Sequence, residues 1–185
     1  MRLACTILLV ACSLAASPQP AGTAPRPLVV VESVALPLSM AQVEKAARAA
    51  WPFTFGEEPG AKVLEDAPGS GRLEGSARFN FRASTVGNRL QTLGVINYHI
   101  SISAENGQCK LRFGQFTHTG NANAPGGAVS IGPLYEGDRP LDPVPGIGIL
   151  VAARLHEDMR QQVVAHVREV AGRFAQRLRM DAESR

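Results

Sequence analysis

Seven side chains that could bind an anion are expected together on one face of a β-sheet, because each occupies an outward position in a strand with a two-residue hydrophobic period. Guanidinium groups bind carboxylates and phosphates through paired hydrogen bonds, and an exposed ring adds a stacking surface. This set predicts a surface for an anionic glycan, a phospholipid head group or a nucleic acid. The alternative is an ordinary solvated face, with Glu74, Ser101 and Ser103 among the cations. The seven residues are Arg72, Arg78, Arg82, His99, Lys110, Arg112 and Phe116.

Sequence patterns typical of catalysis are incomplete in this chain. Gly146-Ile147-Gly148 begins a dinucleotide-binding fingerprint, but Val151 stands where its third glycine is required. His156-Glu157 begins a zinc-protease motif, but Arg160 takes the place of its second histidine. No serine lies in a Gly-x-Ser-x-Gly elbow. We therefore expect no catalytic residue, no metal and no cofactor.

The remaining reactive groups favour structural roles. Glu57 and Glu58 are expected to be solvated turn charges, and Cys109 a small buried strand residue, since a reactive thiol would need a basic partner in a cleft. The histidines lack metal-ligand spacing and are expected at the surface or between elements. They are His99, His118, His156 and His166.

The N-terminal residues 1–16 are typical of an export signal. A short apolar run from Leu3 to Ala11 follows Met1-Arg2 and is too short to span a bilayer as a helix. Residues 17–27 are rich in Pro and Ala and predict a flexible spacer. Leu9-Val10-Ala11-Cys12 also resembles a lipobox, in which Cys12 would carry lipid. We expect a periplasmic or secreted protein, or alternatively an outer-membrane lipoprotein anchored through Cys12.

Composition limits the classes of protein that remain. The chain has 185 residues, of which 45% are hydrophobic, and this suits one domain over residues 28–183 with its own core. The formal net charge of +3 is too balanced to indicate nucleic acid, so no nucleic-acid partner is expected. Removal of the leader leaves Cys109 with at most Cys12, so stability must come from the core rather than from disulfides.

The first half of the domain predicts a strand, a helix and two more strands. A β-branched run at residues 28–34 is typical of a strand, and Ser39 with Gln42 forms a capping box that starts a helix ending before Pro52. A short strand is expected at residues 62–65. In the next strand apolar and polar residues alternate, which favours an antiparallel sheet with one face packed on the core and the other exposed to solvent. The apolar set is Leu73, Gly75, Ala77, Phe79, Phe81 and Ala83.

Residues 95–117 predict a β-hairpin whose register can be stated in advance. Asn106-Gly107 suits a two-residue turn, because both residues tolerate positive φ. That turn pairs Ile102 with Leu111 and Ile100 with Phe113 on the apolar side. It pairs Ser103 with Lys110 and Ser101 with Arg112 on the polar side, so turn chemistry and hydrophobic pattern agree.

The last part of the chain combines a long loop with a helix. Residues 118–154 are dense in Gly and Pro and predict a loop, either a lid over a ligand or partner or a plain mobile insertion. A terminal helix is expected from about Glu157 to Met180, with an apolar stripe that includes Val163 and Phe174. The fold class is therefore α+β: an antiparallel sheet of about five strands, in the order β-α-β-β-β-β-α, with two helices on one face.

This order of elements resembles the TATA-binding-protein-like (TBP-like) fold. The segments Val29–Trp51 and Gly94–Phe116 resemble a bacterial family of exported proteins of unknown function that is common in Bacteroidetes. The likeness is a pattern of strands without catalytic residues, so it implies a fold and no site. The long Gly/Pro loop departs from the family pattern.

Three functions remain open. The first is a non-catalytic binding or accessory module of the envelope, which uses the cationic face or the loop for an anionic envelope ligand. The second is a structural protein that docks another envelope protein through its strand edges or terminal helix. The third is a hydrolase with a site under residues 118–154, for which no nucleophile and base are apparent. Contact with a membrane is expected only through the signal or a lipid anchor.

Overall fold

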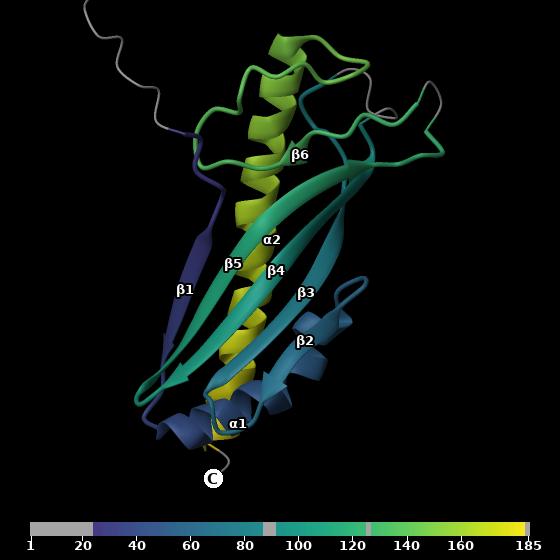
Figure 1. The fold of residues 1–185 in the computed structure, drawn as a ribbon. Helices are drawn as coiled ribbons and strands as arrows, with labels where there is room; N and C mark the ends of the chain where they lie inside the picture. Colours follow the sequence, from purple (N-terminus) through teal and green to yellow (C-terminus); the bar gives the residue numbers. More distant parts are fainter. Residues whose placement is uncertain (1–23, 87–91, 125–126, 184–185) are drawn as a thin grey trace, which may run out of the picture.

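The computed structural model describes residues 24–86, 92–124 and 127–183; the predicted leader and Cys12 lie outside these ranges. The chain forms an α+β domain in which a long helix packs on an antiparallel sheet (Figure 1). The elements in chain order are β1 (Val30–Ala35), α1 (Met40–Ala50), the 3-10 turns η1 (Trp51–Phe53) and η2 (Phe55–Glu57), β2 (Lys62–Ala67), β3 (Arg72–Phe81), β4 (Gly94–Glu105), β5 (Gln108–Gly120), β6 (Gly132–Pro133) and α2 (Ile149–Glu183).

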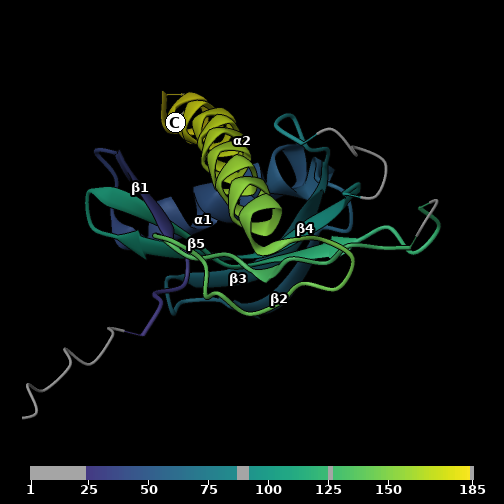
Figure 2. The same ribbon diagram turned by 90° about the horizontal axis from the view of Figure 1, so that it is seen from above.

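The sheet has the strand order β1-β5-β4-β3-β2, with β6 added to β5. In Figure 1 strands β3 to β5 lie in front of α2, and Figure 2 shows α2 over one side of the sheet. Helix α1 packs against β4, β5 and α2 on that same side. The predicted five-stranded sheet with two helices on one face is confirmed, and the two-residue strand β6 is an addition that the sequence did not indicate.

The β4–β5 hairpin has the predicted register. Ile100 pairs with Phe113 and Ile102 with Leu111, and all four side chains are almost completely buried. Gly107 has φ 82°, whereas Asn106 does not have a positive φ, so only the second turn residue uses the left-handed region, as in a type II turn. The side chain of Asn106 accepts a hydrogen bond from the backbone N–H of Met40 at 2.9 Å. The turn therefore also satisfies a free donor at the start of α1.

Both helices bury the faces that the sequence predicted. In α1 the backbone N–H of Ser39 donates to Gln42 Oε1 at 3.0 Å, as expected for the capping box. Helix α2 begins at Ile149 rather than near Glu157. The predicted Gly/Pro loop is correspondingly shorter, spanning residues 121–148 with β6 inside it. The apolar stripe of α2 is fully buried at Val163, Val167, Val170, Phe174 and Leu178.

A β-bulge in β5 moves Phe116 to the side of the sheet opposite the one predicted. The pairing of β4 with β5 shifts between Asn97 and His99, and Gln115 adopts φ 54°. One extra residue in a strand reverses the facing of every residue after it. Phe116 is therefore only 2% exposed and stacks on Tyr98, with ring centroids 5.9 Å apart. The prediction that Phe116 belongs to the polar face was wrong, because strict alternation was assumed across the bulge.

Two of the four histidines, His118 and His156, are buried between elements. His118 is 1% exposed, and its Nδ1 accepts a hydrogen bond from the backbone N–H of Ile131 at 3.3 Å. Its Nε2 is buried without a hydrogen-bond partner, and burial lowers the pKa of His118 to about 4. His156 Nε2 accepts from the backbone N–H of Tyr135 at 3.0 Å, and burial lowers its pKa as well. Both imidazoles tie the 121–148 segment to the core.

A first prediction concerns Gly75, whose place in β3 is filled by the indole of Trp51. A Cβ at this position would overlap the Trp51 ring and lie 2.9 Å from the backbone oxygen of Lys62. We expect Gly75→Ala to lower the free energy of unfolding by about 1–3 kcal/mol, as overpacking does in a filled core. Urea unfolding followed by Trp51 fluorescence measures this. Gly137→Ala is the control, since nothing lies within 4 Å of its Cβ. Equal stability of the two variants would contradict the packing shown here.

A second prediction concerns acid stability through His118. Its pKa of about 4 in the folded chain is below the ordinary unfolded value of about 6.5, so the unfolded chain binds the extra proton between these pH values. The contribution of neutral His118 is thus complete above pH ~6.5 and falls by about 3 kcal/mol as the pH drops to ~4. We expect His118→Gln to flatten the stability profile over that window, measured by urea unfolding at several pH values. His99→Gln serves as control, and parallel profiles for wild type and His118→Gln would refute the role of this group.

Candidate ligand-binding face

The side of the sheet turned away from α1 and α2, here called the open face, carries Arg72, Glu74, Arg78, Ser101 and Arg112. Cross-strand pairing arranges these residues in rows. Arg72 pairs with Ser103, which pairs with Lys110. In the next row Glu74 pairs with Ser101, which pairs with Arg112. The strand pattern therefore brings the predicted cations of β3, β4 and β5 onto one surface.

Glu74 neutralises part of the predicted cationic set. Its side chain is only 12% exposed and lies 3.2 Å from Arg72 Nη2 and 3.5 Å from His99 Nε2. Ser101 Oγ donates a further hydrogen bond to Glu74 Oε1 at 2.8 Å. Because this carboxylate is held between two potential cations, Arg72 and His99 contribute little free charge to the open face.

Lys110 is compensated in the same way. Its Nζ lies 2.7 Å from Oε1 of Glu105, the last residue of β4 before the Asn106-Gly107 turn. The hydrogen bond from Lys110 holds the pKa of the Glu105 carboxyl below its ordinary value. This end of the open face is therefore close to neutral.

Arg78, Arg82 and Arg112 are exposed and form no ion pair with any residue in the described ranges. The side chain of Arg78 lies over Gly60, and a Cβ added at Gly60 would be 3.1 Å from Nε of Arg78. The side chain of Arg112 lies similarly over Gly114, and its Nη1 would be 3.6 Å from a Cβ at that glycine. The glycines leave room for both arms, and the guanidinium groups stay available to a ligand.

The open face offers guanidinium groups without aromatic rings. In the described parts of β3, β4 and β5, every aromatic side chain is buried on the helix side. These are Phe79, Phe81, Tyr98, Phe113 and Phe116. The face thus lacks the stacking platform with which single-stranded nucleic acids are commonly bound.

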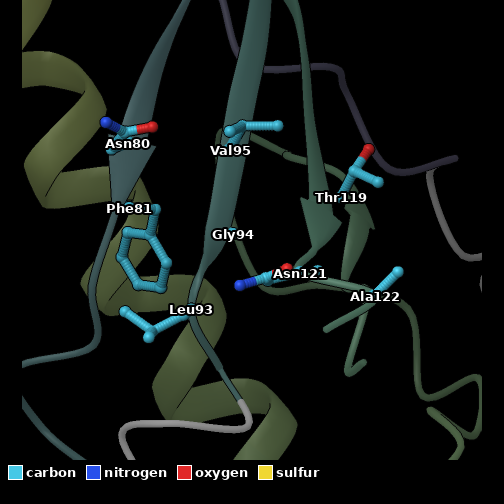
Figure 3. Close-up of a pocket in the computed structure, with 9 residues that line it drawn as sticks. Asn80, Phe81, Leu93, Gly94, Val95, Thr119, Asn121 and Ala122 are labelled. Carbon is cyan, nitrogen blue, oxygen red and sulfur yellow. The ribbon is translucent and has the colours of Figure 1, made fainter. Parts of the chain in front are cut away.

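A groove of about 410 Å³ lies at one end of the open face, where β3 ends and β4 begins (Figure 3). Its polar side chains are Asn80, Thr119 and Asn121, and all three are exposed. Asn80 pairs with Val95, and Val95 with Thr119, so these residues form one cross-strand row. The lining consists of Asn80, Phe81, Leu93, Gly94, Val95, Thr119, Gly120, Asn121 and Ala122. Sequence reasoning missed this groove, because its residues come from separate segments and carry no charge.

Hydrogen bonds hold the walls of the groove. The backbone N–H of Asn121 donates to the carbonyl of Leu93 at 2.8 Å, and Figure 3 shows the Asn121 amide directed toward Gly94 and Leu93. Beyond β3, buried Asp158 of α2 accepts from the backbone N–H of Ser84 at 2.6 Å and from its hydroxyl at 2.8 Å. These bonds and one from Gln162 keep the pKa of the Asp158 carboxyl below its ordinary value against the opposing effect of burial. These hydrogen bonds fix the segments that follow β3 and β5.

A second polar cluster lies on the helix side of the sheet. Glu58 Oε2 lies 2.8 Å from His166 Nε2, and Glu58 Oε1 accepts from Arg173 at 2.9 Å. His166 stacks on Phe79 with centroids 4.3 Å apart. Glu58 is only 9% exposed, so its prediction as a solvated turn charge was wrong. The cluster fastens the segment after η2 to α2, and we assign it a structural role.

The remaining reactive groups provide little chemistry. Cys109 is fully buried in β5, as predicted, and burial raises the pKa of its thiol to about 12. Within the described ranges there is no group of three His, Cys, Asp or Glu side chains placed to hold a metal ion. Over the same ranges, none of the helices has the length and apolar character needed to cross a membrane.

No protein-family model matches the sequence, and no curated protein sequence is significantly similar to it. Several solved structures are similar to this chain, and two of them share its fold closely enough to compare. A DUF4468 family protein from Bacteroides ovatus superposes with a TM-score of 0.53 at 13% identity, over 80% of this chain and 86% of that one. A TBP-like protein from Parabacteroides distasonis gives 0.52 at 11% identity, over 81% and 93%. The chain therefore has the TBP-like fold of these Bacteroidetes proteins, and the resemblance to a family of unknown function with that fold is confirmed at the level of architecture.

Proposed function

We propose that this chain is an exported, non-catalytic binding module whose open face binds an anionic polymer. The observation that carries the proposal is that Arg78 and Arg112 are exposed on an uncovered sheet face, with exposed Arg82 just beyond the end of β3. None of the three forms an ion pair with an acidic residue in the described ranges. Guanidinium groups remain charged at every physiological pH and bind carboxylate, sulfate or phosphate. They supply neither a nucleophile nor a general base, which favours binding over bond cleavage.

The spacing of the free cations favours an extended ligand over a small ion. Arg112 lies in the same row as Glu74, two strands from β3, whereas Arg78 lies four residues further along β3. Strand geometry therefore separates the two Cα atoms by about 13 Å along the strands and about 10 Å across them. A chain with repeated charges can span this separation, whereas a small anion would have to draw the two side chains away from Gly60 and Gly114 to contact both. The absence of exposed rings on the described face favours a polymer without bases.

Replacing Arg78 and Arg112 tests the proposal. Two exposed ion pairs of about 0.5–1 kcal/mol each correspond to an affinity change of about tenfold when both are lost. We expect Arg78→Ala with Arg112→Ala to weaken binding of dextran sulfate by about that factor, measured by titration calorimetry at low ionic strength, where such pairs are least screened.

Arg154→Ala with Arg179→Ala is the matched control. Both residues are exposed on α2, away from the open face, and their loss changes the net charge equally. We expect this control to bind dextran sulfate almost as wild type does. If the two double variants lose affinity equally, the ligand senses only overall charge and the open face is not a site.

Export is the second part of the proposal, and the order of residue types in positions 1–16 supports it. We expect the intact mass of protein purified from the envelope of an expressing bacterium to correspond to a chain that begins at Ser17. A chain that begins at Cys12 and carries added acyl mass would instead identify a lipoprotein. Recovery of a chain that still begins at Met1 would contradict export with cleavage.

A further inference from the structure

The groove adjoins the free cations of β3. Asn80, which lines the groove, lies between Arg78 and Arg82 in the sequence, and all three are exposed. Alternation places Arg78 and Asn80 on the same face with their Cα atoms about 7 Å apart. Arg78 pairs with Asn97 in the row next to the one formed by Asn80, Val95 and Thr119. A ligand seated in the groove therefore lies within reach of a guanidinium group.

The lining of the groove matches a sugar ring better than an anion. The amides of Asn80 and Asn121 and the hydroxyl of Thr119 offer both donors and acceptors, which is the pairing that sugar hydroxyls require. Val95 and Leu93, which are partly exposed, supply apolar surface for the C–H groups of a ring. None of the nine lining residues is charged, so the groove itself supplies no counter-charge for a phosphate or carboxylate.

The backbone of the groove is already shaped before a ligand arrives. Gly94 pairs with Gly120, and a Cβ at Gly94 would overlap the backbone oxygen of Thr119 and the imidazole of His118. A Cβ at Gly120 would come 2.6 Å from the backbone oxygen of Val129. The two glycines thus let three segments meet closely under the groove. A preformed groove has less ordering entropy to lose on binding.

We propose that the groove binds one sugar ring of an acidic polysaccharide, whose carboxylates pair with Arg78 and with the other free cations of the open face. This inference rests on the proposed function and adds the chemical class of the polymer. Neutral polar contacts in the groove select the sugar, while the arginines respond to charge alone. The two parts of the surface can therefore be tested separately.

The experiment compares two polyanions that carry carboxylates at similar density, oligogalacturonate and poly-L-glutamate. Asn80→Ala with Thr119→Val removes polar groups from the groove, and Ser33→Ala on β1 is the control at the distant end of the open face. The side chains of Asn80 and Thr119 are exposed and make no hydrogen bond with the described residues, so these variants should fold. Circular dichroism and the thermal midpoint verify that they do.

We expect wild type to bind oligogalacturonate at least about fivefold more tightly than poly-L-glutamate, from two or more neutral hydrogen bonds. The groove variant should lose about that factor for oligogalacturonate and keep its affinity for poly-L-glutamate. Equal binding of both polymers by wild type, with no effect of the groove variant, overturns the inference and leaves the proposed function intact. Equal weakening of both polymers by the groove variant also overturns it. If neither polymer binds although dextran sulfate does, the inference fails and the proposed function stands. If dextran sulfate does not bind either, both fail.

Discussion

Packing of α2 onto the apolar side of β3, β4 and β5 determines which side chains the sheet presents to solvent. Phe55 connects the layers, with its ring centroid 5.0 Å from that of Phe174 in α2 and 5.8 Å from that of Phe113 in β5. Each fully buried side chain of this size contributes about 1.5–3 kcal/mol. Successive side chains of a strand point to opposite faces of the sheet, so burial of every second residue leaves the residues between them exposed to solvent. The open face is thus a consequence of the core, and its composition is free to serve a ligand.

The parts of the fold that could be predicted are those fixed by local periodicity. The register of the β4–β5 hairpin follows from Asn106-Gly107 and the alternation around it, and α1 follows from its capping box and the proline after Trp51. Phe116 could not be placed, because a bulge with a non-glycine residue at positive φ leaves no signal in the residues around it. Glu58 could not be placed either, since its partners His166 and Arg173 are more than 100 residues away along the chain.

The residues of the candidate site also fall into those that a local pattern could identify and those that it could not. Arg78 and Arg112 were identified because charged residues recurred at every second position of predicted strands. Asn80 follows the same period, whereas Thr119 reaches the open face only because the bulge at Gln115 shifts the register of β5. Amides and hydroxyls are also ordinary on a solvent-exposed face, so they indicate nothing until β3, β4 and β5 form one row. Asn121 lies beyond the end of β5, and only the hydrogen bond of its N–H to Leu93 brings it to the groove. Local patterns identify charge, whereas the shape of a groove depends on contacts between distant segments.

Internal pairing also sets which of the predicted cations can act. Glu74 lies within ion-pair distance of Arg72 and His99, and Glu105 within ion-pair distance of Lys110. The uncompensated positive charge is therefore concentrated at Arg112 and, near the end of β3, at Arg78 and Arg82. At physiological ionic strength the screening length is about 8 Å, which is shorter than the separation between these two regions. They therefore act on a ligand as independent sites rather than as one field. A small anion gains from one region only, but a polymer bound at Arg78 brings its next charges close to Arg112 at high effective concentration. The pattern of compensated and free cations thus selects for ligand length, which a uniformly charged face would not do.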